Sequence, residues 1–372
     1  MAEREVQNVE ESKVHVFSSS TELIGKLDEN WNAVGHQPYP AMYSSIFGGV
    51  VLNPAMMMIP IDDHMVHRGH GVFDTTILFN GYLYDLDAHL DRFLRSASLA
   101  KISLPYPRST LRSILLQLAA VSKCQKGELR YWLSAGPGDF HLSSSGCSKS
   151  AFYAIVIKED FSQWKDGVRA VTSSVPMKTP LFATIKNVNY LPNVLSQMEA
   201  EEKGAFASIW VDDNGYVAEG PNMNVALINH DRELIMPPFD NILTGCTAVR
   251  LLELAPRLVE EGRLKDVKTA NVSVEEAKSA AEMMFVGSGL PIAPIVMWDE
   301  KPIGNEYVAA ITEVHGERTC QQCCCSRQYT IMPCWPCSKY GKMGELSLAL
   351  SDLLWNDMVS APETQRVRVP YE

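Results

Sequence analysis

Apolar residues recur three or four positions apart in several stretches of the chain, a spacing that places them on one face of an α-helix. These stretches span residues 20–31, 87–100, 109–122 and 341–358. A further stretch carries Leu191, Val194, Leu195 and Met198 at the same spacing. We expect these four side chains to form the buried face of a helix.

Short strand-like runs, rich in β-branched and aromatic residues, lie between the helical stretches. Asn80-Gly81 and Asn214-Gly215 each separate two such runs, and Asn-Gly in this position is a strong hairpin signal. In the first half of the chain strands and helices alternate, which is typical of a domain that packs helices against a sheet.

Polar segments mark the expected domain boundaries in a chain of 372 residues, a length that suits two domains. Residues 1–40 are interpreted as a peripheral N-terminal extension that carries one helix. Residues 41–160 are predicted to form a small α/β domain, and residues 161–372 a large domain. The polar residues 158–167 form the linker between them.

The composition is that of a soluble globular protein, with 46% hydrophobic and 21% charged residues. The net charge of −11 argues against nucleic acid or an anionic membrane as a partner. The sequence contains no run of eighteen apolar residues, so we expect no membrane-spanning helix. The N-terminus is rich in glutamate and lacks an apolar core, which favours the cytoplasm over the alternative, the chloroplast.

Two residues in the central stretch suggest a specific chemistry. Lys186 directly precedes the helix at Leu191, and Glu219 follows the hairpin at Asn214-Gly215, which can return it to the neighbourhood of Lys186. A lysine amine forms a Schiff base with the aldehyde of pyridoxal phosphate, and a carboxylate keeps the ring nitrogen protonated. Each residue alone is more typical of a solvated lysine or a strand-end turn, but their order favours the cofactor chemistry.

This stretch resembles the class IV, or fold-type IV, aminotransferases. The matching positions are Ile185-Lys186, Asn189 to Leu191, Gln197 to Gly204, Glu219-Gly220 and Asn224-Val225. The resemblance covers residues 40–303 and 341–354, and is strongest to plant proteins similar to D-amino-acid and branched-chain aminotransferases. It implies an α/β (α+β two-domain) fold, a homodimer, and pyridoxal 5′-phosphate bound between the domains.

The resemblance also implies which residues bind the cofactor. Arg92 is expected to bind the phosphate, with an exposed helical arginine as the alternative. Gly245, Cys246 and Thr247 begin a helix whose free backbone N–H groups suit a phosphate, and helix capping by Thr247 is compatible with this role. The remaining implied positions are Lys186, Glu219, Asn224, Ser288 and Gly289.

Substrate contacts are expected from Phe73, Arg130 and His141. Phe73 stands where D-amino-acid aminotransferases usually carry a tyrosine, and the segment around His141 lacks their Arg-x-His, so substrate choice need not follow theirs. For Arg130, binding of the substrate carboxylate and exposure on a strand are equally compatible with the sequence.

Three histidines, His64, His67 and His70, recur at a spacing of three residues. The surrounding residues do not form a metalloenzyme helix motif. We therefore expect strand or loop structure here, and no metal.

Residues 305–340 form a Cys-rich insertion that the family lacks. The spacing of four of its cysteines is that of a zinc ribbon; they are Cys320, Cys323, Cys334 and Cys337. Three adjacent cysteines and the absence of periodicity favour a disordered loop or a splice-derived insertion instead.

We expect an aminotransferase that moves an amino group between a D- or branched-chain amino acid and a 2-oxo acid through the Lys186 Schiff base. The freed amine of Lys186 then acts as general base and acid. One alternative is a 4-amino-4-deoxychorismate lyase, which eliminates pyruvate through the same lysine. Another is a catalytically silent homologue that binds the cofactor, which the Phe73 substitution, the missing Arg-x-His and the inserted segment motivate.

Overall fold

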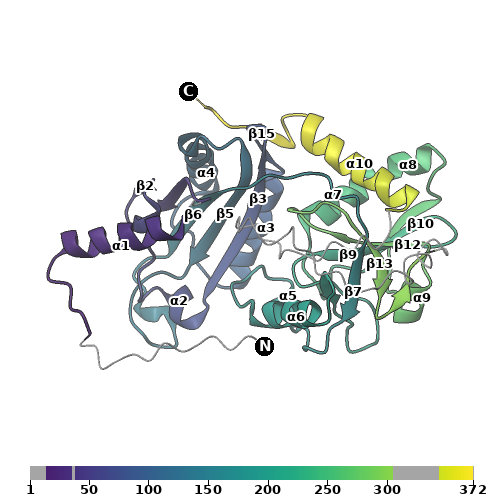
Figure 1. Ribbon diagram of the computed structural model, residues 1–372, viewed down its shortest axis with the longest axis horizontal. Helices are drawn as coiled ribbons and strands as arrows, with labels where there is room; N and C mark the ends of the chain where they lie inside the picture. The colour runs from purple at the N-terminus through teal and green to yellow at the C-terminus, as the bar shows by residue number, and fades with distance from the viewer. Residues whose placement is uncertain (1–13, 36–37, 305–342, 372) are drawn as a thin grey trace.

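A computed structural model describes residues 14–35, 38–304 and 343–371 of the chain. Two β-sheets lie next to each other, each covered by its own helices, as an α+β fold of two domains (Figure 1). Within the described residues, none of the helices combines the length and apolar character needed to cross a membrane. The Cys-rich insertion and its possible zinc site lie outside the described residues.

The first sheet has seven strands in the order β15-β4-β3-β5-β6-β1-β2, and every neighbouring pair is antiparallel. Its strands are β1 (Ala41–Ser44), β2 (Gly49–Val51), β3 (Gly71–Phe79), β4 (Tyr82–Tyr84), β5 (Lys126–Ser134), β6 (Ala151–Lys158) and β15 (Arg366–Arg368). We predicted β15 as part of the large domain, but it pairs with β4, so the end of the chain returns to the first sheet.

Two amphipathic helices pack on one face of this sheet. Helices α3 (Leu86–Leu99) and α4 (Arg108–Ser122) form within one residue of the predicted bounds. Their apolar faces, with Phe93 and Leu115, pack in one core with Leu129 and Tyr131 of β5. This packing fixes the orientation of α3, which carries a residue of the site.

The second sheet is mixed, in the order β11-β10-β9-β12-β13-β7-β8, with β14 paired to β13. Its strands are β7 (Val168–Thr172), β8 (Ala207–Ile209), β9 (Asn224–Ile228), β10 (Glu233–Met236), β11 (Asp266–Thr269), β12 (Glu282–Val286), β13 (Ala293–Trp298) and β14 (Lys301–Pro302). Its helices are α5 (Pro180–Ala183), α6 (Leu191–Glu202), α7 (Cys246–Leu254), α8 (Pro256–Glu260), α9 (Val274–Lys278) and α10 (Glu345–Ser360).

The predicted hairpin between β8 and β9 is confirmed. Asp212 accepts hydrogen bonds from two backbone N–H groups of the turn, those of Asn214 and Tyr216, at 3.0 and 2.9 Å. Gly215 has a φ of +83°, a conformation that glycine adopts without a steric penalty. The returning chain then pairs with Trp210, which donates a backbone hydrogen bond to Glu219 at 2.9 Å.

The remaining elements surround the first sheet: α1 (Ser20–Val34), η1 (Pro54–Met56), α2 (His64–Arg68) and η2 (Ser144–Gly146). Helix α2 corrects the expectation of strand or loop at His64 and His67, whereas His70 lies in the connection between α2 and β3. Asp63 caps it by accepting from the N–H of Met65 at 2.9 Å, and Gly69 ends it in the left-handed region, so local capping forms one helical turn.

The predicted burial of α6 is wrong. Leu191, Val194, Leu195 and Met198 are 45–68% exposed, and the helix instead buries its small and polar residues. Ser196 lies against Ser208 of β8 at 2.5 Å between the hydroxyl oxygens, so helix and strand approach closely. The apolar residues have the spacing of a helix, but the face that they form points away from the rest of this chain.

Candidate active site

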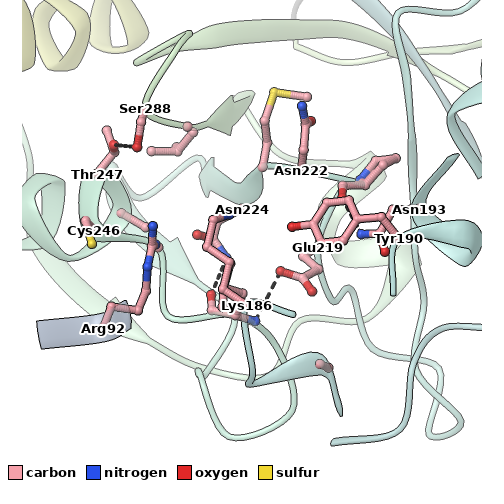
Figure 2. Close-up of a pocket in the computed structure, with 18 of the residues that line it drawn as sticks. Arg92, Lys186, Tyr190, Asn193, Glu219, Asn222, Asn224, Cys246, Thr247 and Ser288 are labelled. Carbon is pink, nitrogen blue, oxygen red and sulfur yellow. Dashed lines mark hydrogen bonds between the residues drawn. The ribbon is translucent and has the colours of Figure 1, made fainter. Parts of the chain in front are cut away.

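A cavity of roughly 530 Å³, including the part open to solvent, lies where the two domains meet. Figure 2 shows its polar side chains in two groups, with Lys186 between them. One group contains Arg92, Cys246, Thr247 and Ser288. The other contains Tyr190, Asn193 and Glu219. Lys178 also lines the cavity, with its Nζ 4.8 Å from the centre of the Tyr190 ring. Arg92 comes from α3 of the small domain, so both domains form the cavity.

The backbone around Lys186 is fixed against the first sheet. The N–H of Phe73 in β3 donates to the carbonyl of Lys186 at 2.9 Å, and the N–H of Val188 donates to Gly71 at 3.1 Å. The N–H of Lys186 donates to the hydroxyl of Ser96 in α3 at 3.2 Å. The Lys186 Nζ lies 4.8 Å from the centre of the Phe73 ring. The backbone of Lys186 is thus hydrogen-bonded to both β3 and α3, which fixes its position as a covalent cofactor site requires.

Glu219 is the buried carboxyl group of the cavity, with 7% of its surface exposed. Its Oε2 accepts a hydrogen bond from the N–H of Leu243 at 3.2 Å. Asn224 holds the same segment, because its amide donates to the carbonyl of Leu243 at 3.0 Å. The structure therefore brings Glu219 into the same cavity as Lys186, 33 positions away in sequence, as the hairpin predicted.

Arg92 is held from behind by a fully buried carboxylate, Asp74 in β3. Arg92 donates through Nε to Oδ2 at 2.9 Å and through Nη2 to Oδ1 at 2.7 Å. The Asp74 Oδ1 also lies 2.8 Å from Nδ1 of His89. Burial raises the pKa of Asp74, but the charges of Arg92 and His89 outweigh it and hold that pKa well below its usual range. Asp74 is therefore an anion that orients Arg92.

The start of α7 forms the other wall beside Arg92. This helix has no side-chain cap, so the N–H groups of its first turn are free for an anion. Inside it, the Thr247 hydroxyl lies 3.2 Å from that of Ser288, in the loop after β12. A Cβ at Gly245 would lie 2.0 Å from the amide oxygen of Asn224, so a larger residue there would displace the Asn224 side chain.

The titratable groups of the cavity have displaced pKa values. Burial and the nearby charge of Arg92 lower the pKa of Lys186 to about 8. Burial raises the pKa of Glu219 to about 8, against the opposing effects of Lys178 and Lys186. Burial also raises the pKa of the Cys246 thiol, but the positive charges of His89 and Arg92 outweigh it and lower that pKa. Such a concentration of displaced values is typical of a catalytic site.

The expected substrate residues occupy different places. Phe73 contacts Lys186, as described above. It lies opposite Trp132 of β5, and Arg130, two positions from Trp132 on the same strand, is on the same face of the sheet as Phe73. Arg130 donates to Glu128 at 2.8 Å and to the hydroxyl of Thr75 at 3.1 Å, so its charge is already paired. The side chain of His141 is 82% exposed, on a loop. Substrate contacts of Arg130 and His141 remain predictions.

Of the expected cofactor residues, Gly289 lies beside the cavity and does not line it. A Cβ at Gly289 would lie 3.3 Å from Oε1 of Glu128, so the loop approaches the first sheet there. The three histidines at and after α2 also lie apart from the cavity lining, and the ring centres of His67 and His70 are 5.1 and 5.2 Å from that of His64. Across the described ranges, no group of three potential ligands is placed to hold a metal.

Several residues of the site were not predicted from the sequence, among them His89, Tyr190, Asp74 and Lys178. His89 precedes Arg92 by three positions, so helical spacing could have shown that the two share one face. Tyr190 lies in the matched motif, where its position beside Glu219 depends on the fold. Asp74 and Lys178 come from a strand and a loop with no local signal of a role, and only the tertiary structure places them at the site.

The residues fit the phosphorylated pyridine aldehyde that the sequence implied. Arg92 and the free N–H groups of α7 match a phosphate, Lys186 provides an amine in the middle, and Glu219 provides a carboxyl group at the far end. The chemistry of this donor set supports the fit.

Comparison with known proteins agrees with this geometry. The family model for amino-transferase class IV matches residues 71–298. The chloroplastic D-amino-acid transaminase of Arabidopsis thaliana is 54% identical over 340 residues, which cover 91% of this chain and 82% of that protein. A bifunctional aminodeoxychorismate lyase / D-amino acid transaminase of Mycobacterium tuberculosis is 29% identical over 226 residues, 56% of this chain and 76% of that protein.

Among solved structures, the branched-chain amino acid aminotransferase of Thermobaculum terrenum, in its PLP form, has a similar fold. Its TM-score is 0.70 at 16% identity, covering 90% of this chain and 99% of that one. The expected fold class is thereby confirmed. The family match covers more than half of the chain, and a relative above half identity covers nearly all of it. The chain belongs to the class IV aminotransferases, enzymes that use pyridoxal 5′-phosphate.

Proposed function

We propose that this protein is a pyridoxal 5′-phosphate-dependent aminotransferase that acts on D-amino acids, with branched-chain amino acids as the second donor class. The observation that carries the proposal is a single cavity with Lys186 between an anion site at Arg92 and a buried carboxyl group at Glu219. The D-amino-acid preference is supported by the 54% identity to the Arabidopsis thaliana protein of that name.

The bound cofactor supplies an electron-withdrawing ring that stabilises negative charge at the substrate α-carbon. The residues of this chain hold that ring and move the proton. Arg92, oriented by Asp74, and the first turn of α7 bind the phosphate. Glu219 binds the ring nitrogen and favours its protonated form.

Lys186 is suited to move the proton. Its pKa of about 8 leaves part of the amine neutral near pH 7. Nζ can therefore accept the proton of the substrate α-carbon and donate it again later in the reaction. The Phe73 ring packed beside it restricts the side chain and excludes water on that side. Lys186→Ala should therefore abolish turnover.

Spectra of the purified protein test the proposal. Addition of pyridoxal 5′-phosphate should produce an absorption band at the violet edge of the visible spectrum. D-alanine or another D-amino acid should then bleach this band, and a 2-oxo acid should restore it. A band that none of a panel of D- and L-amino acids changes would contradict the transaminase assignment.

Lyase activity is the second candidate, and the relative that carries both activities favours it. The same lysine would serve an elimination that releases pyruvate from 4-amino-4-deoxychorismate. Pyruvate formed without any added 2-oxo acid would identify the lyase. A protein that binds the cofactor but performs neither reaction would be the silent homologue.

We also infer a homodimer. Its support is the apolar surface of α5 and α6, which includes Leu181, Phe182, Leu191, Leu195 and Met198, each at least 45% exposed. Large exposed apolar side chains on two consecutive helices are a feature of protein interfaces. The mass in solution, measured by light scattering, tests the inference.

The compartment also remains a proposal. The relative named as chloroplastic favours the chloroplast, and the cytoplasm is the alternative. A fluorescent protein fused to the C-terminus would distinguish the two.

A further inference from the structure

A second cavity of roughly 710 Å³, including the part open to solvent, lies beside the candidate active site. Helices α3 and α7 line most of it with residues three or four positions apart, which are Asp85, Ala88, Asp91, Arg92 and Arg95 from one helix and its N-cap and Cys246, Val249, Arg250 and Glu253 from the other. Arg92 and Cys246 line both cavities. A cavity of this size suits a small molecule, which would lie next to the phosphate site without occupying it.

Asp85 occupies the N-cap position of α3, where an aspartate ordinarily accepts a hydrogen bond from the first turn of the helix. Here its φ is +54°, and its side chain makes no capping bond. Within the described ranges, its carboxylate has neither a hydrogen-bond partner nor an ion-pair partner. Asp85 is nevertheless buried, with 7% of its surface exposed. Buried polar groups almost always have partners, so this carboxylate calls for a functional explanation.

Both carboxylate oxygens of Asp85 open into the second cavity. Asp85 lines this cavity, and neither oxygen is among the side-chain atoms of the described residues that lack both solvent contact and a hydrogen-bond partner. The small exposed area of the residue therefore includes both oxygens. Two free acceptors on one planar group match the two parallel N–H donors of a guanidinium group, as in the bidentate pairs of arginine with carboxylates.

The positive groups nearest to Asp85 do not pair with it, because they already have carboxylate partners. His89 binds Asp74 at 2.8 Å. Arg250 donates to Asp357 through Nε at 2.8 Å and through Nη2 at 2.7 Å. Asp85 is therefore left without a cation of its own among the described residues.

The surroundings of Asp85 keep this end of the cavity negative at pH 7. Burial raises the pKa of Asp85 to about 6, although the nearby positive charges oppose the rise, so most of the group is a carboxylate at pH 7. A further arginine of the lining, Arg95, lies ten positions along α3, about 15 Å along the helix axis. The titratable and charged groups that face Asp85 come from β4, α3, α7 and α10, and they are Tyr84, His89, Arg250, Glu253 and Asp357.

We propose that the second cavity binds a small molecule that carries a guanidinium group, and that this group donates two hydrogen bonds to the Asp85 carboxylate. The proposal goes beyond the reaction at Lys186 and does not depend on it. It accounts for a buried carboxylate that neither caps its helix nor pairs with another residue in the part of the chain that the structure describes.

Binding of methylguanidinium tests the proposal. Its dissociation constant is measured by isothermal titration calorimetry, with pyridoxal 5′-phosphate added throughout to fill the first cavity. Methylurea has nearly the same shape but no charge, and tetramethylammonium has the charge but no N–H donor. Asp85→Asn removes the charge, and asparagine tolerates the left-handed conformation of this position. Asp91→Asn is the matched control, because Asp91 lines the same cavity but is exposed and pairs with Arg108.

We expect Asp85→Asn to weaken methylguanidinium binding at pH 7 by about tenfold or more, and Asp91→Asn to weaken it by less than about twofold. Methylurea and tetramethylammonium should bind the wild type about tenfold more weakly or worse. The affinity of the wild type for methylguanidinium should rise about tenfold from pH 5 to pH 8, as Asp85 loses its proton near pH 6. Asp85→Asn should not lower the melting temperature, because it removes an unpaired buried charge.

Three results would overturn the proposal. One is an absence of methylguanidinium binding to the wild type, or an equal affinity of the wild type and Asp85→Asn. Another is equal binding of methylurea, which would mean that the charge plays no part. The third is a melting temperature that falls by several degrees in Asp85→Asn, which would show that the carboxylate supports the fold instead. None of these results bears on the absorption spectrum that tests the proposed function.

Discussion

Replacement of Asp74 by asparagine should be costly for the fold and for phosphate binding. The carboxylate accepts three hydrogen bonds from the side chains of Arg92 and His89, at 2.7, 2.8 and 2.9 Å, and one from the backbone N–H of Thr75 at 2.7 Å, and none of its surface is exposed. Asparagine keeps the shape, but its amide turns an N–H₂ donor toward other donors and removes the negative charge between two buried cations. Removal of one partner from a buried ion pair costs about 3–5 kcal/mol of unfolding free energy.

Asp87→Asn is the matched control, because Asp87 lies in the first turn of α3 and pairs with Arg108 and Arg112 in half-exposed positions. Exposed pairs contribute about 1 kcal/mol or less. Urea unfolding at pH 7, followed by circular dichroism, measures both variants. The depressed pKa of Asp74 means that its contribution to stability is present above pH 3.8 and is lost as the pH falls below that value. The unfolding free energies of Asp74→Asn and Asp87→Asn should therefore converge in acid.

The same variant should also weaken the binding of pyridoxal 5′-phosphate, because Arg92 loses the group that orients it. If Asp74→Asn costs no more than Asp87→Asn in unfolding free energy, the buried carboxylate does not hold Arg92 as described. An unchanged dissociation constant for the cofactor would separately refute its role at the phosphate.

Three further predictions follow from the same contacts. Lys186→Met should raise the unfolding free energy of the cofactor-free protein at pH 7 by about 1–3 kcal/mol, because the lowered pKa of Lys186 means that its positive charge destabilises the folded state. Urea titrations at pH 7 and pH 10.5 should show that this gain in stability shrinks as the wild-type lysine loses its proton. Cys246 and Asp74 raise the pKa of His89 to about 9 in spite of its burial, so its contribution to stability is present below pH 6.5 and is lost as the pH rises to 9. In His89→Gln, the melting temperature should therefore fall less between pH 6.5 and pH 9 than in the wild type. Leu195→Glu, on the exposed apolar face of α6, should halve the mass measured by light scattering and leave the melting temperature of the monomer within a few degrees; an unchanged mass would exclude this face from the interface.

Local signals were sufficient for much of the fold. Helices α3 and α4 follow from apolar spacing, and the turn at Gly215 follows from Asn-Gly, because both depend on neighbouring residues only. The approach of Glu219 to Lys186 could be predicted for the same reason, since one helix, one strand and one hairpin connect them. Pro256 is the first residue of α8, directly after α7 and its C-cap Ala255, a position in which proline is compatible with a helix.

The failures have a common cause in tertiary structure. The apolar residues of α6 have helical spacing, but spacing alone does not tell whether a helix buries its apolar face in its own chain. The return of β15 to the first sheet depends on an unpaired edge at β4, which lies far away in sequence. Asp74 reads as one polar position in a strand, and its role appears only where β3 meets α3.

Chemical mapping of the cofactor tests the central claim most directly. The protein is loaded with pyridoxal 5′-phosphate and treated with borohydride, which makes a lysine–cofactor bond permanent, and its peptides are then sequenced by mass spectrometry. We predict one phosphopyridoxyl group, on the peptide that contains Lys186, and none on the Lys186→Ala variant. A label on Lys178 instead, or an equal label on the variant, would contradict the assignment of Lys186 as the residue that binds the cofactor.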